Sequence, residues 1–404
     1  MNVLMIAPEP FFEPRGTPIS VYQRLWALSE LGYQVDLLTY HVGRDVNIPN
    51  VSVHRTPRIP FIRAVKIGPS FTKLFLDILL FGQAFAFLWR RHYDVIHTHE
   101  EASFFSLVLR PLFRINHLYD MHSSLPRQLK SFNFGNWWPL YQLFTRLERR
   151  VLHTCDAVIT IDDELRTYVK AINSTVPALS IENHAVHISR RSEQAAPLQP
   201  LHKKELFQNR VPIVYTGTFE RYQGLDLLLA SLKTVASQVP AVLYILVGGR
   251  PYQVKQLQAA VRAEQLDEWI HFAGMVSPEE ALTYLDIAEV LVSPRINGTS
   301  IPLKIYSYLH AGKAIVATDL PAHTQVLNDQ IALLVMPTAA ALADGIVKLL
   351  RAPDLRRSLA QRAQQFAQEQ YNATDYLAKV AQVYQTLRPA AEVAEKSIRR
   401  LETR

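Results

Sequence analysis

One segment, Ser293 to Thr318, constrains the fold of this chain more than any other. It leaves an apolar strand, crosses a short polar loop, enters a helix at Pro302, stops at Gly312 and runs into a second apolar strand. Proline suits the first helical turn because its missing N–H has no partner there, and glycine suits the left-handed position after a helix. This order of elements predicts an α/β domain with a parallel sheet. The loop also directs backbone N–H groups outward beside Arg295 and Lys304, which predicts an anion site.

Length and composition indicate a two-domain globular protein with an anionic partner. The 404 residues are too many for one ordinary core, and 49% hydrophobic with 20% charged residues is a globular composition. Lys and Arg number 43 against 36 Asp and Glu, giving a net charge of +7. Such a charge favours nucleic acid, an acidic membrane or a phosphorylated ligand. Because no base-stacking or groove-reading motif is present, we expect no nucleic-acid partner.

The chain carries few signals for export, disulfides or metal. Its one cysteine, Cys155, cannot form a disulfide framework or a zinc cluster, which favours a reducing cytoplasm. The stretch Met1 to Ala7 lacks a signal peptide's basic start and predicts a buried first strand. Residues 74–89 are shorter than the roughly 20 residues that a membrane span requires, so we expect a packed helix and no transmembrane segment. The expected location is cytoplasmic, at the inner face of the cell membrane for a lipid acceptor.

Two α/β halves follow one another along the chain. Strands are predicted at 2–7, 34–39, 94–97, 117–120 and 156–160 in the first half, and at 211–215, 242–247 and 290–292 in the second. Helices are predicted at 19–31, 224–236 and 354–387. The predicted organisation is a Rossmann-like domain over 1–188, a linker over 189–206, a second Rossmann-like domain over 207–370, and a C-terminal helix with a charged tail over 371–404. We expect two doubly wound domains that face each other across a cleft.

Ligands of parallel sheets bind outside the carboxyl ends of the strands. The loops at those ends are 8–18, 97–100, 120–126, 217–224, 248–250, 274–276 and 297–303. We expect all of them to line the cleft between the two domains.

In their order along the chain, these loops resemble the motifs of the family 4 glycosyltransferases, which have the GT-B fold and belong to the glycogen-synthase-like superfamily. The matching segments are Pro14–Pro18, Tyr93–His99, Asp120–His122, Tyr215–Asp226, Phe272–Val276 and the segment from Ser293 to Thr318. The resemblance covers nearly the whole chain. It implies transfer of a sugar from a nucleoside-diphosphate sugar to a hydroxyl, with retention of the anomeric configuration and without a metal or other cofactor.

The resemblance also implies site residues. Those of the catalytic centre are His122, Lys304 and Arg295. Those that bind the donor, a UDP-sugar in preference to a GDP-sugar, are Gly16, Thr17, Gly217, Thr218, Arg221, Gly248, Gly249, Arg250, Met275, Val276, Thr299, Ser300, Ile301, Pro302, Leu303 and Ser307. Those on the acceptor side are Arg15 and His99, and we add Trp137 and Trp138 because they belong to a stretch rich in aromatic residues.

Some of these residues also have structural interpretations. Lys304 stands at a helix start, where the helix dipole disfavours a cation, so a phosphate-binding role is favoured over a solvated lysine. His122 either contacts the donor sugar or is satisfied by Asp120. His97 and His99 occupy alternate positions of one strand end, and we expect only His99 to face the cleft.

The pair Asp162 and Asp163 is a separate case, because acidic residues commonly open a helix. We therefore interpret this pair as structural and expect no metal dependence.

The sequence departs from the family pattern at four positions. The usual acidic pair falls on Thr299 and Ser307, and the usual Arg and Lys of the second-domain glycine loop fall on Thr218 and Gln223. A hydroxyl is a weaker partner for ribose than a carboxylate. Phosphate contacts would then come from Arg221, Arg250, Arg295 and Lys304. Two interpretations remain open here: an enzyme that moved its charges, and a binding protein with a degenerate donor site.

Basic and aromatic residues interleave over 55–73 and 132–141. This mixture suits an anionic membrane interface and a lipid-linked or cell-envelope glycan acceptor. Two ordinary insertions with aromatic residues facing the core would give the same pattern.

Overall fold

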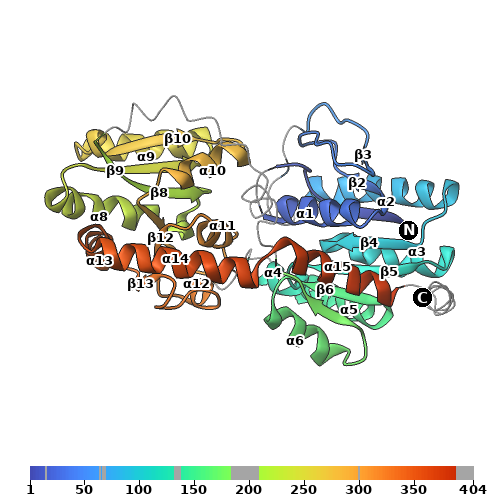
Figure 1. Ribbon diagram of the computed structural model, residues 1–404. Coiled ribbons are helices and arrows are strands. Elements are labelled where there is room, and N and C mark those ends of the chain that lie inside the picture. Colours follow the sequence, from blue (N-terminus) through green and yellow to red (C-terminus); the bar gives the residue numbers. More distant parts are fainter. Residues whose placement is uncertain are drawn as a thin grey trace, which may run out of the picture. The chain divides into compact units, whose positions relative to one another are not determined.

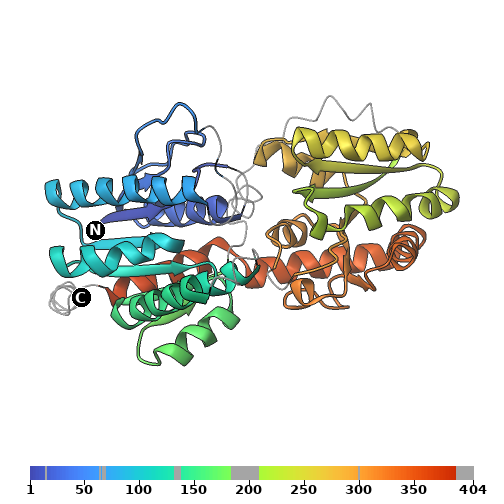
Figure 2. The ribbon, with the colours of Figure 1, turned by 180° about the vertical axis from the view of Figure 1, so that it is seen from behind.

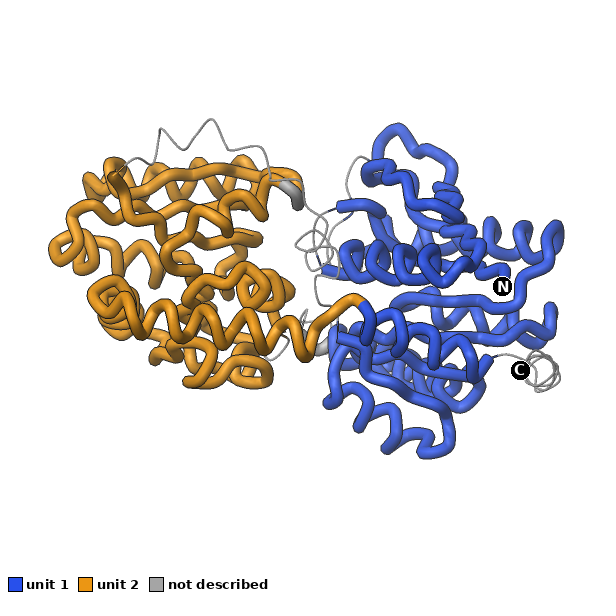
Figure 3. Tube along the Cα trace, viewed as in Figure 1, with its two compact units in different colours: residues 1–183, 374–404 blue, residues 184–373 orange. Residues whose placement is uncertain are grey.

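The computed structural model describes residues 1–13, 16–62, 65, 70–131, 138–182, 209–298 and 301–387. The chain divides into two compact units, residues 1–183 with 374–404 and residues 184–373 (Figure 3). Each unit is built on one parallel sheet with helices packed on it (Figure 1).

The first unit has a seven-stranded sheet in the order β3-β2-β1-β4-β5-β6-β7, and its neighbouring strands are parallel. Its strands are β1 (Asn2–Ala7), β2 (Gln34–Thr39), β3 (Val51–Arg55), β4 (Val95–His99), β5 (Asn116–Met121), β6 (Ala157–Thr160) and β7 (Ala178–Ser180). Its helices are α1 (Gly16–Glu30), α2 (Phe71–Arg90), η1 (Glu100–Phe105), α3 (Ser106–Phe113), α4 (Leu125–Ser131), α5 (Trp138–Thr154), α6 (Asp163–Ile172) and α15 (Ala373–Thr386). The strand order reverses between β1 and β4, which makes this the topological switch point of the sheet.

The second unit repeats this plan with six parallel strands in the order β10-β9-β8-β11-β12-β13. Its strands are β8 (Val211–Gly217), β9 (Val242–Gly248), β10 (Ile270–Gly274), β11 (Val290–Ser293), β12 (Ala314–Thr318) and β13 (Leu333–Val335). Its helices are η4 (Arg221–Gln223), α8 (Leu225–Gln238), α9 (Pro251–Ala263), η5 (Asp267–Trp269), α10 (Pro278–Asp286), α11 (Lys304–His310), α12 (Pro321–Thr324), α13 (Ala339–Arg351) and α14 (Pro353–Gln370). The switch point of this sheet lies between β8 and β11.

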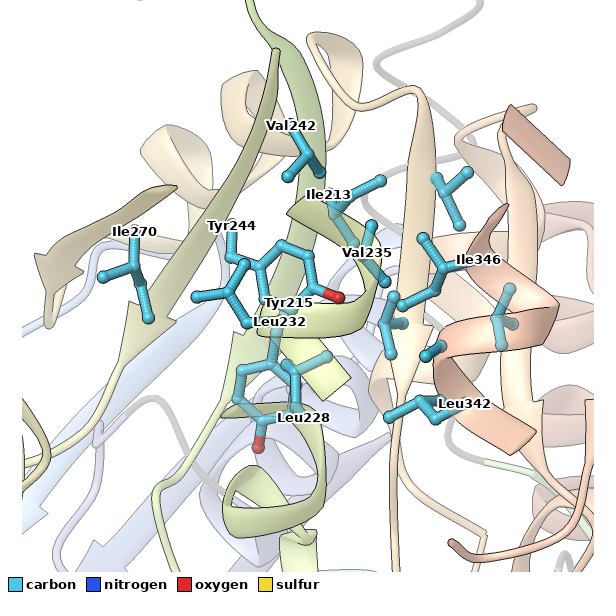
Figure 4. Packing of buried hydrophobic residues seen from close by; sticks show 14 of the residues in the cluster. Ile213, Tyr215, Leu228, Leu232, Val235, Val242, Tyr244, Ile270, Leu342 and Ile346 are labelled. Atoms are coloured by element: carbon cyan, nitrogen blue, oxygen red, sulfur yellow. The ribbon is translucent and has the colours of Figure 1, made fainter. Parts of the chain in front are cut away.

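The strands of the second unit are apolar throughout because both faces of the sheet are covered. Ile213 and Tyr215 face a cluster built with α8 and α13, including Leu232 and Ile346 (Figure 4). Val214, between them, belongs to the cluster on the opposite face. A parallel sheet covered on both faces explains why the strands were recognisable as continuous apolar runs.

The last helix crosses back to the first unit. α15 is grouped with residues 1–183, whereas α14 belongs to the second unit (Figures 2 and 3). Tyr376 and Tyr384 of α15 are completely buried. Residues from the end of the chain therefore form part of the core of the first unit.

Helix α2 packs on the first sheet by one face only. Leu76, Leu80, Ala84 and Leu88 are buried, as expected of a packed helix. The opposite face is apolar but exposed, and α2 is the single helix of the described residues that is long and apolar enough to cross a membrane. A core helix of a soluble protein can pass the same test.

Two local expectations can be compared with the structure. Asp162 caps α6 by accepting a hydrogen bond from the Leu165 N–H at 2.7 Å, which confirms its structural interpretation. Helix α11 begins at Lys304, two residues later than the predicted start at Pro302, and Gly312 after it has the left-handed φ of 62°.

Candidate functional site

The two switch points bring together most of the chemistry-bearing residues of each unit. In the second unit β8 ends at Gly217, the loop after β11 carries Arg295, and α11 follows with Lys304. In the first unit α1 follows β1 and begins at Gly16 and Thr17, while β4 ends at His99. Each unit therefore has a candidate site at the carboxyl edge of its sheet, where ligands of parallel sheets bind.

In the second unit, Lys304 is the centre of a group that we call the cation cluster, with Arg295, Gln223, Tyr215 and Tyr222. The Lys304 Nζ donates a hydrogen bond to Gln223 Oε1 at 3.1 Å and lies 3.8 Å from the centre of the Tyr215 ring. The Arg295 guanidinium lies 5.0 Å from the centre of the Tyr222 ring. Both cations thus rest on aromatic faces, which attract positive charge.

The charge of the cation cluster is not neutralised at Lys304. Burial, followed by repulsion from Arg295, holds the pKa of Lys304 well below its usual 10.5. Burial also lowers the pKa of Arg295. Within the described part of the chain, no carboxylate forms an ion pair with Lys304. A desolvated cation without a counter-charge is costly, so a bound anion would stabilise it.

Glycine is required where the loops of this site approach one another. Gly217 has φ of 140°, and a Cβ there would lie 3.0 Å from the Lys304 Nζ. A Cβ at Gly248 would lie 2.0 Å from the Gly217 carbonyl oxygen. The ends of β8 and β9, where Gly217 pairs with Gly248, therefore pack backbone against backbone beside Lys304.

The structure shows what surrounds Thr218 and Gln223, the positions at which the family pattern has basic residues. Gln223 Nε2 donates to Thr218 Oγ1 at 3.4 Å, and the same side chain accepts from Lys304. Where the family pattern has a basic residue at position 223, this chain places the ammonium group of Lys304 at hydrogen-bond distance from that position. The positive charge comes from α11 instead of from the glycine loop.

The other residues predicted to bind the donor are less closely grouped. Arg221 and Arg250 are exposed, Met275 is 62% exposed, and Val276 is half-buried. Gly249 is buried after β9, Ile301, Pro302 and Leu303 lead into α11, and Ser307 is half-buried within it. Thr299 and Ser300 lie outside the described residues, as do Arg15 and Trp137 of the acceptor-side set. Trp138, at the start of α5, is 66% exposed.

In the first unit, His97, His99, Asp120, His122 and Arg24 form what we call the histidine cluster. His97 and His99 are both fully buried, and their rings stack with centroids 4.8 Å apart. The expectation that only one of them would face the site was wrong. Residues two apart in a strand point to the same face, so both rings lie on one side of β4.

Asp120 connects the members of this cluster. Its Oδ2 accepts from Arg24 Nε at 2.7 Å and lies 3.4 Å from His97 Nε2. Its Oδ1 lies 3.4 Å from His122 Nε2, which in turn lies 3.1 Å from His99 Nδ1. The His122 side chain, only 7% exposed, thus shares a hydrogen bond with His99 and lies in charge contact with Asp120.

The charges of the histidine cluster follow from burial and from Arg24. Burial alone would raise the pKa of Asp120, but Arg24 and His122 hold it well below 3.8, so this carboxylate is charged at neutral pH. Burial lowers the pKa of His122 to about 4 and that of His97 below 6.5, so these imidazoles are neutral. Arg24 and Asp120 are completely buried, and their opposite charges compensate each other.

One triad of the described residues has the spacing of a metal site. Ligand atoms of His97, His99 and Asp120 lie within 4.8 Å of one another. Asp120 is already paired with Arg24, whose charge would repel a cation. We therefore assign no metal to the triad, and metal independence stays a prediction.

Three residues of the first-unit site were not predicted: Arg24, Tyr376 and Tyr384. The Arg24 Nη1 donates to the Tyr376 hydroxyl at 2.6 Å, and the Tyr384 hydroxyl lies 2.7 Å from His97 Nδ1. The tyrosines lie more than 250 positions from their partners in the sequence, and nothing in the local pattern of α15 marks them. Of the three, only Arg24 could have been found from the sequence, because it is a charged residue on the apolar side of a predicted helix.

Comparison with known proteins agrees with this architecture. Residues 14–179 match the family described as Glycosyltransferase Family 4, and residues 210–352 match Glycosyl transferases group 1. The chain is 26% identical over 394 residues to phosphatidyl-myo-inositol mannosyltransferase of Mycobacterium leprae, with 96% of this chain and 97% of that protein covered. It is 24% identical to the protein of the same description from Mycolicibacterium smegmatis, with 96% and 94% covered.

Solved structures show the same fold. Sucrose-phosphate synthase from Thermosynechococcus elongatus superimposes with a TM-score of 0.74 at 20% identity, covering 96% of this chain and 98% of that one. HepE from Anabaena in complex with UDP-glucose gives 0.71 at 15% identity, covering 96% and 100%. Two parallel α/β units of this kind define the GT-B glycosyltransferases. The chain belongs to the glycosyltransferases, with a family 4 domain in its first part and a group 1 domain in its second part.

The buried pair in the histidine cluster gives a stability prediction. Asp120→Asn leaves the Arg24 charge buried without compensation, and we expect it to reduce the free energy of unfolding by about 3–5 kcal/mol at neutral pH. Since the native pKa of Asp120 is lowered, its contribution is present above 3.8 and declines as the pH falls from there toward the native value. Urea unfolding over a pH series measures both effects.

The matched control is Asp45→Asn, which removes the partner of Arg55 at a carboxylate that is 92% exposed. It should cost less than about 1 kcal/mol. An equal loss in the free energy of unfolding in Asp120→Asn and Asp45→Asn would contradict the strong stabilisation that we assign to the buried Arg24–Asp120 pair.

Proposed function

We propose that this protein is a retaining glycosyltransferase that moves a sugar from a nucleoside-diphosphate sugar, UDP in preference to GDP, to a hydroxyl of a glycolipid-type acceptor, without a metal. The observation that carries the proposal is the desolvated ammonium group of Lys304, which has Arg295 beside it and no carboxylate partner among the described residues. A diphosphate would supply the missing negative charge. The solved HepE complexes contain UDP and UDP-glucose, and the mannosyltransferase relatives act on phosphatidyl-myo-inositol according to their names.

The chemistry requires positive charge at the leaving group. When the bond between the sugar and the diphosphate breaks, negative charge grows on the phosphate oxygens, and fixed cations in a site of low polarity stabilise that charge. We assign this role to Lys304 and Arg295. Helix α11 has only seven residues, so we assign the effect to the two side-chain charges and not to a helix dipole.

The alternative, a binding protein with a degenerate donor site, rested on the missing acidic pair at Thr299 and Ser307 and on the missing basic residues at Thr218 and Gln223. Lys304 supplies positive charge beside Gln223 from a different element. This geometry favours the enzyme that moved its charges.

The donor role of Lys304 predicts a binding defect without a folding defect. Lys304→Met keeps the apolar stem over Tyr215 but removes the charge, so affinity for a nucleoside diphosphate should fall roughly 10- to 100-fold. Titration calorimetry with UDP and GDP, each with and without excess chelator, measures this loss, names the base and tests metal independence.

The control is Lys233→Met, because Lys233 is 61% exposed and pairs with Glu264 on the surface. It should leave the affinity unchanged. Unchanged affinity in a folded Lys304→Met variant would exclude Lys304 from phosphate binding.

The lowered pKa of Lys304 predicts that donor binding takes up a proton. A bound diphosphate raises this pKa, so between the free-state and bound-state values the complex holds one proton more than the free protein, and affinity declines as the pH rises through that window. Calorimetry over a pH series, with two buffers of different ionisation enthalpy at each pH, counts the protons. Lys304→Met should abolish the uptake, and identical heats in both buffers for the unaltered protein would contradict the predicted linkage.

We further propose that α2 contacts an anionic membrane that carries the acceptor. Phe71, Leu74, Phe75 and Ile78 follow one another at helical spacing and are 92, 58, 45 and 62% exposed. An apolar helix face in a chain of net charge +7 suits an interface of acidic lipids.

The α2 face predicts binding to vesicles. Leu74→Ser combined with Ile78→Ser should weaken sedimentation with phosphatidylglycerol vesicles about tenfold or more, because two apolar side chains no longer enter the bilayer. Met336→Ser is the control, since Met336 is 64% exposed on the second unit. Equal binding by the double variant and the unaltered protein would reject the α2 surface.

A further inference from the structure

A continuous polar chain runs from the C-terminal helix to His122 inside the first unit. α15 lies against the elements of this unit in both ribbon views (Figures 1 and 2). Its Tyr376 hydroxyl contacts Arg24, its Tyr384 hydroxyl contacts His97, and both partners contact Asp120. Asp120 Oδ1 then lies 3.4 Å from His122 Nε2, a charge contact and not a hydrogen bond.

The positions of the protons in this chain follow from Asp120. An ionised carboxylate only accepts hydrogen bonds, so the His97 Nε2 that faces Asp120 Oδ2 carries the proton of that ring. A neutral imidazole has one N–H, and His97 Nδ1 is therefore an acceptor. The Tyr384 hydroxyl donates to it at 2.7 Å.

Tyr376 acts on the Asp120 carboxylate through Arg24. Arg24 donates to Asp120 through Nε at 2.7 Å, to the Tyr376 hydroxyl through Nη1 at 2.6 Å and to the Ile181 carbonyl through Nη2 at 3.2 Å. These three contacts set the plane of the guanidinium group. Asp120 is thus held between Arg24 and His97, and each of these is held by a tyrosine of α15.

This orientation of Asp120 determines which nitrogen of His122 carries a proton. His122 Nε2 lies 3.4 Å from Asp120 Oδ1 and 3.1 Å from His99 Nδ1. A lone pair on Nε2 would face a charged carboxylate oxygen, whereas an N–H there is attracted by it. The proton therefore lies on Nε2, and Nδ1 keeps its lone pair.

We propose that Tyr376 and Tyr384 are positioning residues that hold His122 as the Nε2–H tautomer, so that its Nδ1 accepts a hydrogen bond from a sugar or acceptor hydroxyl. The last clause rests on the proposed function, whereas the tautomer itself does not. The C-terminal helix thus completes the first-unit site as well as its core.

The opposite tautomer is the competing arrangement. With the proton on His99 Nδ1, His122 Nε2 would be the acceptor and His122 Nδ1 the donor. That arrangement also avoids leaving a donor at His99 Nε2, which is buried without a hydrogen-bond partner among the described residues. It instead places a lone pair against Asp120 Oδ1, and we judge the charged contact to dominate.

Nitrogen NMR of the free protein separates the two arrangements without any substrate. Protein labelled with 15N-histidine gives different shifts and coupling patterns for protonated and unprotonated ring nitrogens, and His122→Gln assigns the His122 signals. The proposal predicts one dominant tautomer of His122, with a protonated Nε2. A protonated Nδ1 in the unaltered protein would overturn it.

Variants of α15 test the positioning role. Tyr376→Phe with Tyr384→Phe removes two hydroxyls and keeps both rings, so Asp120 gains freedom and His122 should become a mixture of tautomers. Tyr168→Phe is the matched control, since Tyr168 donates to the Glu148 carboxylate at 2.6 Å in the same unit but outside the chain. An unchanged His122 tautomer in a folded double variant would show that the tyrosines are only structural.

Kinetics then connect the tautomer to the reaction. With a donor found by calorimetry, the double variant should lower kcat about three- to tenfold, the equivalent of one net hydrogen bond, and leave the donor affinity unchanged because the cation cluster is intact. Equal losses in the double variant and in Tyr168→Phe would contradict the proposal. If no donor binds, the proposed function fails while the NMR result stands on its own.

Discussion

The buried ion pair between Arg24 and Asp120 is the interaction on which the first unit depends. Both side chains are completely buried, and each would be strongly destabilising without the other. The pair keeps Asp120 ionised, while burial keeps His97 and His122 neutral. The tyrosines of α15 then have defined hydrogen-bond roles. One pair thereby joins a helix near the start of the chain, the sheet and the final helix.

The two units use the same topology with opposite electrostatics. Both place their site residues at a reversal of strand order, where the loops separate and leave room for a ligand. In the first unit the charges of Arg24 and Asp120 compensate each other without a ligand, and such a site suits neutral hydroxyl groups. In the second unit Lys304 is desolvated with no carboxylate partner in the described residues, which suits capture of an anion.

Much of the fold could be predicted from the sequence because buried parallel strands are continuous apolar runs. The predicted bounds of β1 and β2 match the structure, and those of β4, β5 and β6 differ by at most two residues. The edge strands of both sheets, β3, β7, β10 and β13, were missed because most of their residues are only partly buried, so that no continuous apolar run marks them.

Less of the candidate site than of the fold could be predicted from the sequence. Lys304 and His122 could be selected from the motifs, but the contact between Lys304 and Gln223 joins two elements that are distant in the chain. The same holds for the tyrosines of α15, which depend on the return of the last helix to the first unit. The shared face of His97 and His99 was available from strand geometry alone and was misjudged.

A transfer assay tests the central claim most directly. The protein is incubated with radiolabelled UDP- and GDP-sugars and a phospholipid and glycolipid extract, and label is counted in the organic phase with and without chelator. The account predicts label in the lipid product from one donor, unaffected by chelator, with the donor's anomeric configuration kept in the new bond. Inversion of that configuration, or no transfer from any donor to any lipid fraction, would contradict it.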